Sequence, residues 1–375
     1  MTEGALGAVR LAVPVIPAGL DTPCLVVDLD VVEANARRLQ AAMDARGVRL
    51  RPHAKTHKSV ALGRLQLDEG AVGLTVGTLG EAEVFTAAGL TDLFVAYPVW
   101  AVGPKAARLR AVHDAGDLAV GFDSVAGAER LAASVAGSDR PLRARIEIDS
   151  GGHRSGVGSP ERAADIARAA IDLGLVVDGV FTHGGHGYAG PDAREAAAAD
   201  EVRALTAAAE ALAAVGIDVA IVSAGSTPTM IDAAAGRVNE IRAGTYLLGD
   251  RHEVALGAMG ADAIAGYIAA TVISTAVPGQ VVIDAGAKTL TKDRAPYVEG
   301  FGALPAYPEA LIERVNDYHG VVHIPPGTPG PHLGEVVAVA PNHICPVVDL
   351  FDDFVVTRSG RLEGRWPVDA RGRSG

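Results

Sequence analysis

The segment DTPCLVVDLDVVEANARRLQAAMDARGVRLRPHAKTHK, residues 21–58, contains the pattern that decides the fold. An Asp-Thr-Pro turn precedes the apolar run CLVVD, which predicts a short buried strand. The following VVEANARRLQAAMDARGV has apolar residues at helical spacing and a glycine just after its last basic residue, which predicts a helix that ends near Gly47. The chain then enters RLRPHAKTHK, where a second strand ends and a polar loop begins.

The same alternation of strand and helix continues to about residue 250. About eight strand-helix units fit into residues 21–250, which is the size range of a (β/α)8 TIM barrel. A doubly wound open sheet is the competing arrangement. In both cases the fold class is α/β.

From about residue 260 the sequence changes character. Short β-type runs such as GYIAATVISTAV, GQVVIDAG and EVVAVAP alternate with Gly, Pro and Asp turns, which predicts a separate β-domain. One segment in this region, ALIERVND, has helical spacing. We therefore predict a barrel at residues 21–255 and a β-domain formed by residues 1–20 and 256–375, with the first twenty residues as an extra strand.

The composition limits the class of function. The formal net charge is -12 and the pI is near 5.4, and the clustered excess of Lys and Arg that nucleic-acid binding needs is absent. No apolar run approaches the roughly 20 residues that span a bilayer, and no basic segment precedes the weakly apolar N-terminus. The two cysteines, Cys24 and Cys345, are expected to be reduced. We expect a cytoplasmic protein that acts on a small molecule, with neither nucleic acid nor a membrane as partner.

Lys55 is the first candidate for chemistry. It lies in RPHAKTHKS, directly after a predicted barrel strand and among His53, His57 and Lys58. Barrel enzymes hold catalytic groups at the C-terminal ends of strands, and neighbouring cations lower the proton affinity of a lysine, which favours Schiff-base chemistry. A solvated basic loop is the alternative interpretation.

Two glycine-containing turns near the end of the predicted barrel suit a phosphate group. Gly225, Ser226 and Thr227 follow a Val/Ile strand in IVSAGSTPTM, and Gly244 follows Arg242 in NEIRAGTYLLGD. Small residues let backbone N–H groups approach a phosphate, and hydroxyl groups add donors. Each turn alone is a common pattern, but adjacent turns at this place form the usual phosphate site of a barrel.

The motif PNHICPVVDL is a candidate metal site. His343 and Cys345 are separated by one residue in strand-like sequence, so their side chains are expected on one face. An imidazole and a thiolate suit zinc or another borderline metal, and two protein ligands leave positions open for water or substrate. A buried structural cysteine beside an incidental histidine is the alternative.

Polar side chains also gather in two loops that follow predicted strands. RIEIDSGGHRSGV contains His153 and Arg154, and FTHGGHGYAG contains His183, His186 and Tyr188. Each of these polar groups would need its own partner if it were buried in a core. We therefore interpret them as site residues.

Together these segments resemble the D-serine dehydratase and D-threonine aldolase family. The resemblance runs through LDTPCLVVDLDVVEANARRLQ, RPHAKTHKS, EIDSGGHRSGV, SAGSTPT, EIRAGTYLLGD and PNHICPVVDL, and it covers nearly the whole chain. Members are fold-type III pyridoxal phosphate enzymes, related through their barrel to alanine racemase. The resemblance implies pyridoxal 5'-phosphate and a divalent metal as cofactors, and a homodimer.

The resemblance also implies roles for the motif residues. Lys55 would carry the cofactor, and Tyr188 lies where the dehydratase-like members have an active-site tyrosine. As catalytic groups, Lys55 would take the Cα proton, and His186 or Tyr188 could be the base that takes a substrate hydroxyl proton. The residues implied to contact the cofactor are Arg154 at its phenolate oxygen, His183 and Tyr188 beside it, Arg242 at its pyridine nitrogen, and Gly225, Ser226, Thr227, Gly244 and Thr245 at its phosphate. His343 and Cys345 would bind the metal, with zinc as first choice and manganese or magnesium as alternatives.

The metal motif separates the two branches of the family. Aldolases typically have H-x-D and a GGGTGT-type loop, whereas dehydratases have H-x-C; this chain has H-I-C and SAGSTPT. Both features favour a lyase that removes water from a D-3-hydroxy amino acid by β-elimination and gives a 2-oxo acid and ammonia. Retro-aldol cleavage to glycine and an aldehyde is the alternative activity. A racemase and a non-catalytic cofactor carrier are more distant alternatives.

Overall fold

The computed structural model describes residues 10–375 and divides the chain into two compact units. One unit contains Arg37–Gly244 and Gly372–Gly375, and we call it the barrel unit; the other contains the chain up to Ala36 and Thr245–Arg371, and we call it the β unit. Within the described residues, every helix is too short or too polar to cross a membrane.

The barrel unit is built on a parallel sheet of eight strands in the order β2-β9-β8-β7-β6-β5-β4-β3. A bridge between His53 and Thr75 joins the two ends of this sheet, and the Val72 amide donates to the Leu50 carbonyl at 2.9 Å. The (β/α)8 barrel is therefore confirmed, because an open doubly wound sheet would leave its end strands unpaired. The strands are β2 Arg49–Leu50, β3 Leu74–Val76, β4 Asp92–Pro98, β5 Asp117–Phe122, β6 Arg143–Glu147, β7 Val176–Phe181, β8 Ile221–Ala224 and β9 Glu240–Ile241.

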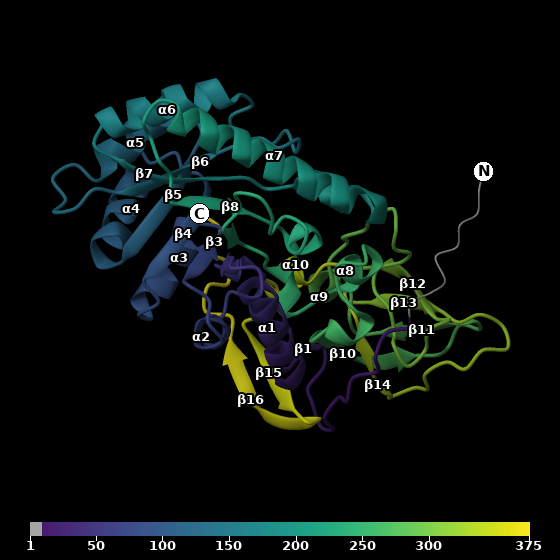
Figure 1. Ribbon diagram of the computed structural model, residues 1–375. Coiled ribbons are helices and arrows are strands. Elements are labelled where there is room, and N and C mark those ends of the chain that lie inside the picture. Colours follow the sequence, from purple (N-terminus) through teal and green to yellow (C-terminus); the bar gives the residue numbers. More distant parts are fainter. Residues whose placement is uncertain (1–9) are drawn as a thin grey trace. The chain divides into compact units, whose positions relative to one another are not determined.

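Helices lie along the outside of this sheet (Figure 1). They are α2 Val60–Asp68, α3 Leu79–Ala87, α4 Pro104–Ala115, α5 Val125–Ser134, α6 Pro160–Asp172 and α7 Arg194–Ala213. Three of them begin at a hydroxyl N-cap, since the side chains of Thr78, Ser124 and Ser159 each accept a backbone amide of the first helical turn. These caps fix where each helix starts. The loop before each of these helices begins at the C-terminal end of a barrel strand.

The β unit contains a mainly antiparallel sheet in the order β12-β13-β11-β10-β1-β15-β16, with β14 also paired to β10. Its core includes Val26, Ala269 and Val355 from three neighbouring strands. The strands are β1 Cys24–Asp28, β10 Gly266–Ser274, β11 Gln280–Ile283, β12 Leu311–Val315, β13 Gly320–His323, β14 Val336–Val339, β15 Asp353–Arg358 and β16 Arg361–Pro367. Its helices are α8 Arg251–Ala255, α9 Ala287–Leu290 and α10 Ile344–Val348, and α1 Leu29–Asp44 contains the boundary between the units.

Short 3-10 helices occur in both units. Those of the barrel unit are η1 Ala54–Thr56, η2 Gly185–Ala189, η3 Pro191–Ala193 and η4 Thr227–Thr229. Those of the β unit are η5 Thr245–Leu247 and η6 Ala261–Ala263.

The limits of the compact units differ from the predicted limits at residues 21 and 255. Strand β1 pairs antiparallel with β10 and parallel with β15, so it belongs to the β unit. The segment from Thr245 also belongs to that unit. Local pattern predicts a strand at β1 but does not say which strands it pairs with.

Three local predictions in the β unit are wrong. ALIERVND forms strand β12, whose hydrogen bonds to β13 override its helical spacing. In PNHICPVVDL, His343 is the N-cap of helix α10 and does not lie in a strand. Residues 10–20 contain no strand, although Leu11, Ile16 and Leu20 pack against buried side chains of the β unit. The rest of the predicted N-terminal strand, residues 1–9, lies outside the described residues.

Candidate active site

Lys55 lies in the short helix η1, directly after β2 at the C-terminal end of the barrel. The His53 side chain caps this helix, because its Nδ1 accepts from the Lys55 backbone amide at 3.4 Å. The Lys55 side chain is exposed. A Cβ atom at Gly77 would lie 3.5 Å from Lys55 Cβ, so a glycine after β3 leaves room beside the lysine.

The loop around Lys55 is held by buried polar contacts. His57 Nδ1 accepts from the Ser59 amide at 3.1 Å and His57 Nε2 is 3.1 Å from Gln66 Oε1. Burial lowers the pKa of His57 to about 4, and burial followed by the charge of Lys55 lowers the pKa of His53 well below its ordinary value. Both imidazoles are therefore neutral at pH 7, so Lys55 has fewer cationic neighbours than the sequence predicts.

The cation that does lie near Lys55 is itself paired. Lys58 is buried, and its Nζ lies 3.6 Å from Oε1 of the buried Glu81. Glu81 Oε2 accepts from the Gly77 amide at 2.6 Å. The pKa of Glu81 is raised by burial, against the Gly77 amide and the charge of Lys58. Glu81 could not be predicted from the sequence, because an isolated Glu on a helix is common.

A pocket of about 200 Å³ opens at the C-terminal ends of β6 and β7, and it is lined by Glu147, Arg154 and His183 among others. Arg154 is 62% exposed at its side chain, and its Nη2 lies 3.7 Å from Glu147 Oε1. Burial, followed by the positive charges of Lys55 and Arg154, lowers the pKa of His183 to about 3. The pocket therefore combines one accessible cation with a neutral imidazole.

The two other predicted residues of this loop follow His183 in helix η2. His186 Nε2 lies 3.2 Å from Asp200 Oδ2, a carboxylate on helix α7. The Tyr188 ring lies 6.2 Å from the His183 ring, at a tilt of 43°. The structure therefore brings His183 and Tyr188 together and gives His186 an acidic partner.

The predicted phosphate turns have the geometry of close-packed loops. Gly225 has φ +83, where a side chain would be strained, and its amide donates to Glu201 Oε1 at 3.2 Å. The Ser226 amide donates to Thr229 Oγ1 at 3.0 Å. A Cβ atom at Gly244 would lie 2.8 Å from Thr56 Oγ1, in the loop of Lys55. The turn at Gly225 and the loop of Lys55 are therefore both closely packed. The Gly225 amide already donates to Glu201, so it is not free to bind a phosphate.

Arg242 is buried in the barrel, below these loops. Its Nη1 donates to Ser223 Oγ at 2.7 Å, and its Nη2 donates to the Thr182 carbonyl. Its guanidinium group also lies over the rings of Phe94 and Phe181. Burial lowers the pKa of Arg242 to about 10, against the charge of Glu240, so it remains a cation at neutral pH.

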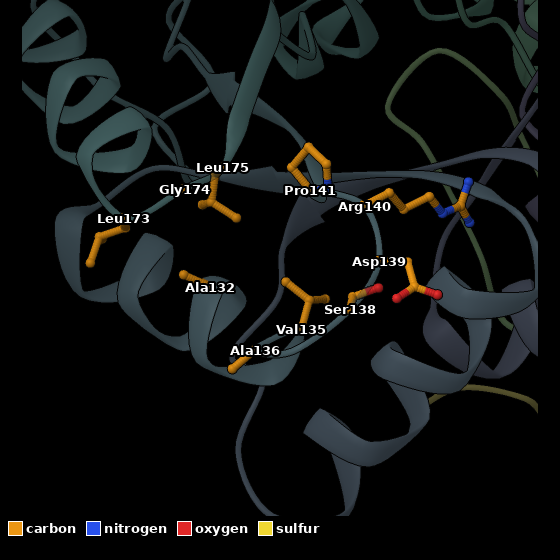
Figure 2. Close-up of a pocket in the computed structure, with 10 residues that line it drawn as sticks. All are labelled: Ala132, Val135, Ala136, Ser138, Asp139, Arg140, Pro141, Leu173, Gly174 and Leu175. Atoms are coloured by element: carbon orange, nitrogen blue, oxygen red, sulfur yellow. The ribbon is translucent and has the colours of Figure 1, made fainter.

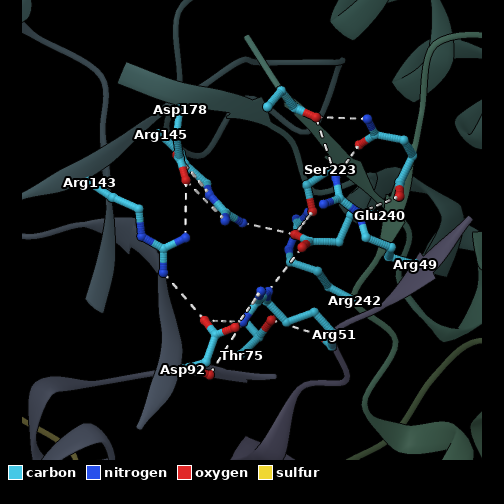
Figure 3. A network of polar contacts seen from close by, with 12 residues as sticks. Arg49, Arg51, Thr75, Asp92, Arg143, Arg145, Asp178, Ser223, Glu240 and Arg242 are labelled. Atoms are coloured by element: carbon cyan, nitrogen blue, oxygen red, sulfur yellow. Dashed lines mark hydrogen bonds and ion pairs between the residues drawn. The ribbon is translucent and has the colours of Figure 1, made fainter. Parts of the chain in front are cut away.

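Glu240 connects Arg242 to a network of charges that fills the barrel interior (Figure 3). Glu240 Oε1 accepts from Ser223 Oγ at 2.7 Å and from Arg145 Nη1 at 2.8 Å, and Oε2 accepts from Arg51 Nε at 2.9 Å. The Glu240 and Arg145 side chains are both fully buried. Although burial opposes it, the charges of Arg145 and Arg51 lower the pKa of Glu240 to about 2.

The network ends at two acids near the N-terminal ends of the strands. Asp178 accepts from Arg145 at 3.1 Å, and Asp92 accepts from Arg51 at 2.8 Å. Arg143 contacts both acids. Buried charges are tolerated only when they are paired and hydrogen-bonded, and this network satisfies that requirement.

The hollow in Figure 2, with a volume of about 300 Å³, lies elsewhere in the barrel unit. Its lining comes from the α5–β6 and α6–β7 connections, including Val135, Arg140 and Leu175, and contains none of the predicted site residues. These connections precede strands β6 and β7, and barrels carry their active sites at the opposite end of the strands. We assign this hollow no role in catalysis.

The predicted metal ligands lie in the β unit, where the start of α10 brings them together. His343 Nδ1 lies 2.8 Å from Asp293 Oδ2. This carboxylate fixes the orientation of the imidazole ring and leaves Nε2 to face a metal. The Thr245 hydroxyl lies 3.6 Å from Cys345 Sγ. The Ile344 amide donates to Asp250 Oδ2 at 3.0 Å, which holds the backbone between the two ligands.

The surroundings of His343 are negatively charged. Although burial opposes it, the thiolate of Cys345, Asp250 and Asp293 raise the pKa of His343 to about 10. Such an environment favours a cation. In residues 10–375 no group of three or more His, Cys, Asp and Glu side chains is arranged to hold a metal ion.

Two family models match the chain. One, described as "Alanine racemase, N-terminal domain", matches residues 27–252, and the other, described as "Putative serine dehydratase domain", matches residues 265–357. The chain belongs to the D-serine dehydratase and D-threonine aldolase family. This confirms the resemblance found in the sequence, and the family member is a fold-type III, pyridoxal phosphate-dependent lyase.

The relatives of this protein include a dehydratase and an aldolase. It is 38% identical to D-threo-3-hydroxyaspartate dehydratase of Delftia sp. (strain HT23) over 350 residues, which cover 87% of this chain and 91% of the relative. It is 32% identical to D-threonine aldolase of Arthrobacter sp over 391 residues, which cover 100% of both chains. The crystal structure of D-threonine aldolase from Filomicrobium marinum matches with a TM-score of 0.88 at 30% identity, covering 97% of this chain and 99% of that one.

A D-threo-3-hydroxyaspartate dehydratase has also been solved as a histidine-to-alanine variant and as a cysteine-to-alanine variant, the latter described as metal-free. The two substituted positions are two residues apart. His343 and Cys345 have the same spacing in this family member.

The residues of the barrel unit fit pyridoxal phosphate. An exposed lysine at the C-terminal end of a strand is available for an imine bond, and the hydroxyls of Ser226 and Thr227 follow a glycine turn. In the β unit, His343 and Cys345 with Asp293 behind them fit a divalent metal. The acids that hold these residues, namely Glu81, Asp200, Glu201, Glu240, Asp250 and Asp293, were all missed in the sequence, because each lies far along the chain from its partner.

Proposed function

We propose that this protein is a pyridoxal phosphate- and metal-dependent dehydratase of D-3-hydroxy amino acids. The observation that carries the proposal is the pairing of His343 and Cys345, with His343 fixed by Asp293 at 2.8 Å. A histidine and a cysteine with this spacing are the residues altered in the solved variants of D-threo-3-hydroxyaspartate dehydratase, and the cysteine variant is described as metal-free. The products would be a 2-oxo acid and ammonia.

Each residue of the barrel has a defined task in this proposal. Lys55 Nζ would hold the cofactor covalently and, once displaced by the substrate amine, accept the Cα proton. Arg154 is exposed and would bind the phenolate oxygen, while the neutral His183 would lie beside the ring. Ser226, Thr227, Gly244 and Thr245 would hold the phosphate. When bound, pyridoxal phosphate supplies the electron sink that makes the Cα proton acidic.

Arg242 would lie at the pyridine nitrogen, as the resemblance implies. Its Nη1 and Nη2 groups donate to Ser223 and Thr182, which fixes its orientation in the barrel. A fixed cation there would keep a proton off the pyridine nitrogen. The amide of Gly225 is held by Glu201, so we propose that Gly225 serves the phosphate turn through its backbone conformation.

His343 and Cys345 would hold the divalent metal, and Thr245 would support Cys345 through its hydroxyl. A Lewis acid there would stabilise hydroxide as the leaving group of the substrate. Zinc suits the imidazole and thiolate pair, and manganese or magnesium are the alternatives. We also propose a homodimer in the cytoplasm, as the resemblance implies.

Retro-aldol cleavage is the second candidate, because one observation favours it. His186 is held by Asp200 at 3.2 Å, which orients an imidazole that could accept the proton of a substrate hydroxyl. Tyr188 in the same helix could do the same. The products would then be glycine and an aldehyde.

Removal of the metal is expected to lower oxo acid formation by at least about 10- to 100-fold, since mutation of an outer-shell partner of a metal ligand alone has an effect of that size. The measurement is product analysis with D-serine, D-threonine and D-3-hydroxyaspartate, with and without a chelator, for the wild type and for Cys345→Ala. Cys24→Ala is the matched control, because Cys24 is buried in strand β1. Glycine and aldehyde as the main products would support the aldolase, and unchanged turnover after chelation and in Cys345→Ala would refute the metal part of the proposal.

A further inference from the structure

Glu201 is a fully buried acid of helix α7 that joins two loops of the barrel mouth. Its Oε1 accepts the backbone amide of Gly184 at 2.9 Å and that of Gly225 at 3.2 Å. Gly184 follows His183 in the loop after β7, and Gly225 begins the loop after β8. One oxygen atom therefore fixes the spacing between the loop of His183 and the predicted phosphate turn.

Glycines at positions 184 and 225 leave the space that the Glu201 contacts require. A Cβ atom at Gly184 would lie 2.8 Å from Glu201 Cδ, so any side chain there would push the carboxyl group away. At Gly225 the backbone has φ +83, and a Cβ atom would lie 2.8 Å from Ile241 Cδ1. Both positions therefore require glycine for reasons of space, and at Gly225 also for reasons of conformation.

A second contact carries the effect of Glu201 further into the turn. Thr229 lies near Glu201 and lowers the pKa of its carboxyl group, and Thr229 Oγ1 accepts the Ser226 amide at 3.0 Å. Burial raises the pKa of Glu201, against these hydrogen bonds. Glu201 thus fixes the start of the turn at 225–229 through the Gly225 amide, and Thr229 fixes the next residue through the Ser226 amide.

We propose that Glu201 is a positioning residue for the phosphate group of the cofactor. It holds the turn at 225–229 so that the hydroxyls of Ser226 and Thr227 face the phosphate, without touching the phosphate itself. The inference rests on the proposed function, because it takes pyridoxal phosphate as the ligand of this turn. It assigns the role to a residue outside every motif of the site.

The test compares pyridoxal phosphate with pyridoxal, which forms the same imine but lacks the phosphate group. Dissociation constants of both compounds are measured by absorbance titration of the apoenzyme. The variants are Glu201→Met, which removes the acceptor of both amides; Glu201→Gln, which keeps an oxygen at the position of Oε1; and Thr229→Val, which removes the hydroxyl that accepts the Ser226 amide. Glu210→Met is the matched control, since Glu210 is exposed on the same helix.

We expect Glu201→Met to weaken pyridoxal phosphate binding by about 10- to 100-fold, the effect of losing two hydrogen bonds. Thr229→Val is expected to weaken it by about tenfold, the effect of one. Both variants should bind pyridoxal as the wild type does, and Glu201→Gln and Glu210→Met should keep wild-type affinity for both compounds. If Glu201→Met does not fold, Thr229→Val decides the question.

Two results would overturn the inference: wild-type affinity for pyridoxal phosphate in a folded Glu201→Met or in Thr229→Val, or an equal loss for pyridoxal, which would indicate general damage to the site. A wild-type protein that forms no imine with either compound would instead refute the proposed function.

Discussion

Lys55→Ala is expected to lower turnover of D-3-hydroxy amino acids by about 10⁴-fold, because it removes both the covalent anchor of the cofactor and the base at Cα. The exposed side chain at the end of β2 should make no other contribution, so folding should be unaffected. The measurements are the rate of oxo acid formation and the visible absorbance of the reconstituted protein, which should lose its imine band.

Lys105→Ala provides the control for this prediction, because Lys105 lies on helix α4 of the same unit and outside the site. It should keep both the activity and the absorbance band of the wild type. A Lys55→Ala protein that retains the imine band would show that another lysine carries the cofactor, and the assignment of Lys55 would then be wrong.

Glu240→Ala is expected to lower the free energy of unfolding by about 3–5 kcal/mol, the effect of removing one partner from a buried group of charges. The variant would leave Arg51 and Arg145 without the carboxylate that lies at 2.9 Å and 2.8 Å from them. Urea unfolding measures the change. Glu210→Ala, at an exposed position, should differ from the wild type by no more than about 0.5 kcal/mol. Equal stability of Glu240→Ala and the wild type would contradict the prediction.

The low pKa of Glu240, about 2 compared with 4.5 for an ordinary Glu, also predicts how stability depends on pH. A carboxyl group whose pKa is lower in the folded state stabilises the fold above the unfolded value and loses this effect as the pH falls through the folded value. The free energy of unfolding of the wild type should therefore fall between pH 4.5 and pH 2 more steeply than that of Glu240→Ala. Parallel curves for the two proteins over this range would contradict the prediction.

Much of the fold was predictable because hydrophobic periodicity repeats from one strand-helix unit to the next. The periodicity located β1 and the helix after it, but could not assign β1 to a sheet, since its partners Ala269 and Val355 are distant in the chain. The same limit explains LIERV: its spacing fits a helix, whereas pairing with β13 makes it a strand. The local sequence pattern therefore predicts many helices and strands, but the pairing between distant strands decides which sheet each strand joins.

The residues of the candidate site were likewise predictable only where they lie in a local motif. Lys55, His183, His343 and Cys345 lie in compact motifs whose residue types indicate their chemistry. The residues that hold them do not: Glu201 lies in an Ala-rich helix, and Asp293 is 50 residues from His343. The sequence also indicates a cationic cluster around Lys55, but burial keeps His53 and His57 neutral, and burial is a property of the folded chain.

Strand β1, early in the chain, and strands β15 and β16, late in the chain, all belong to the β unit, and this has a consequence for the order in which the units form during synthesis. All barrel strands have been translated once Ile241 is made, whereas β15 and β16 come last. Since domains fold as units during synthesis, we expect the barrel to become compact before β10 and β15 are available to pair with β1. A gene fragment that stops at residue 255 would leave β1 as a bare apolar edge, and such edges promote self-association.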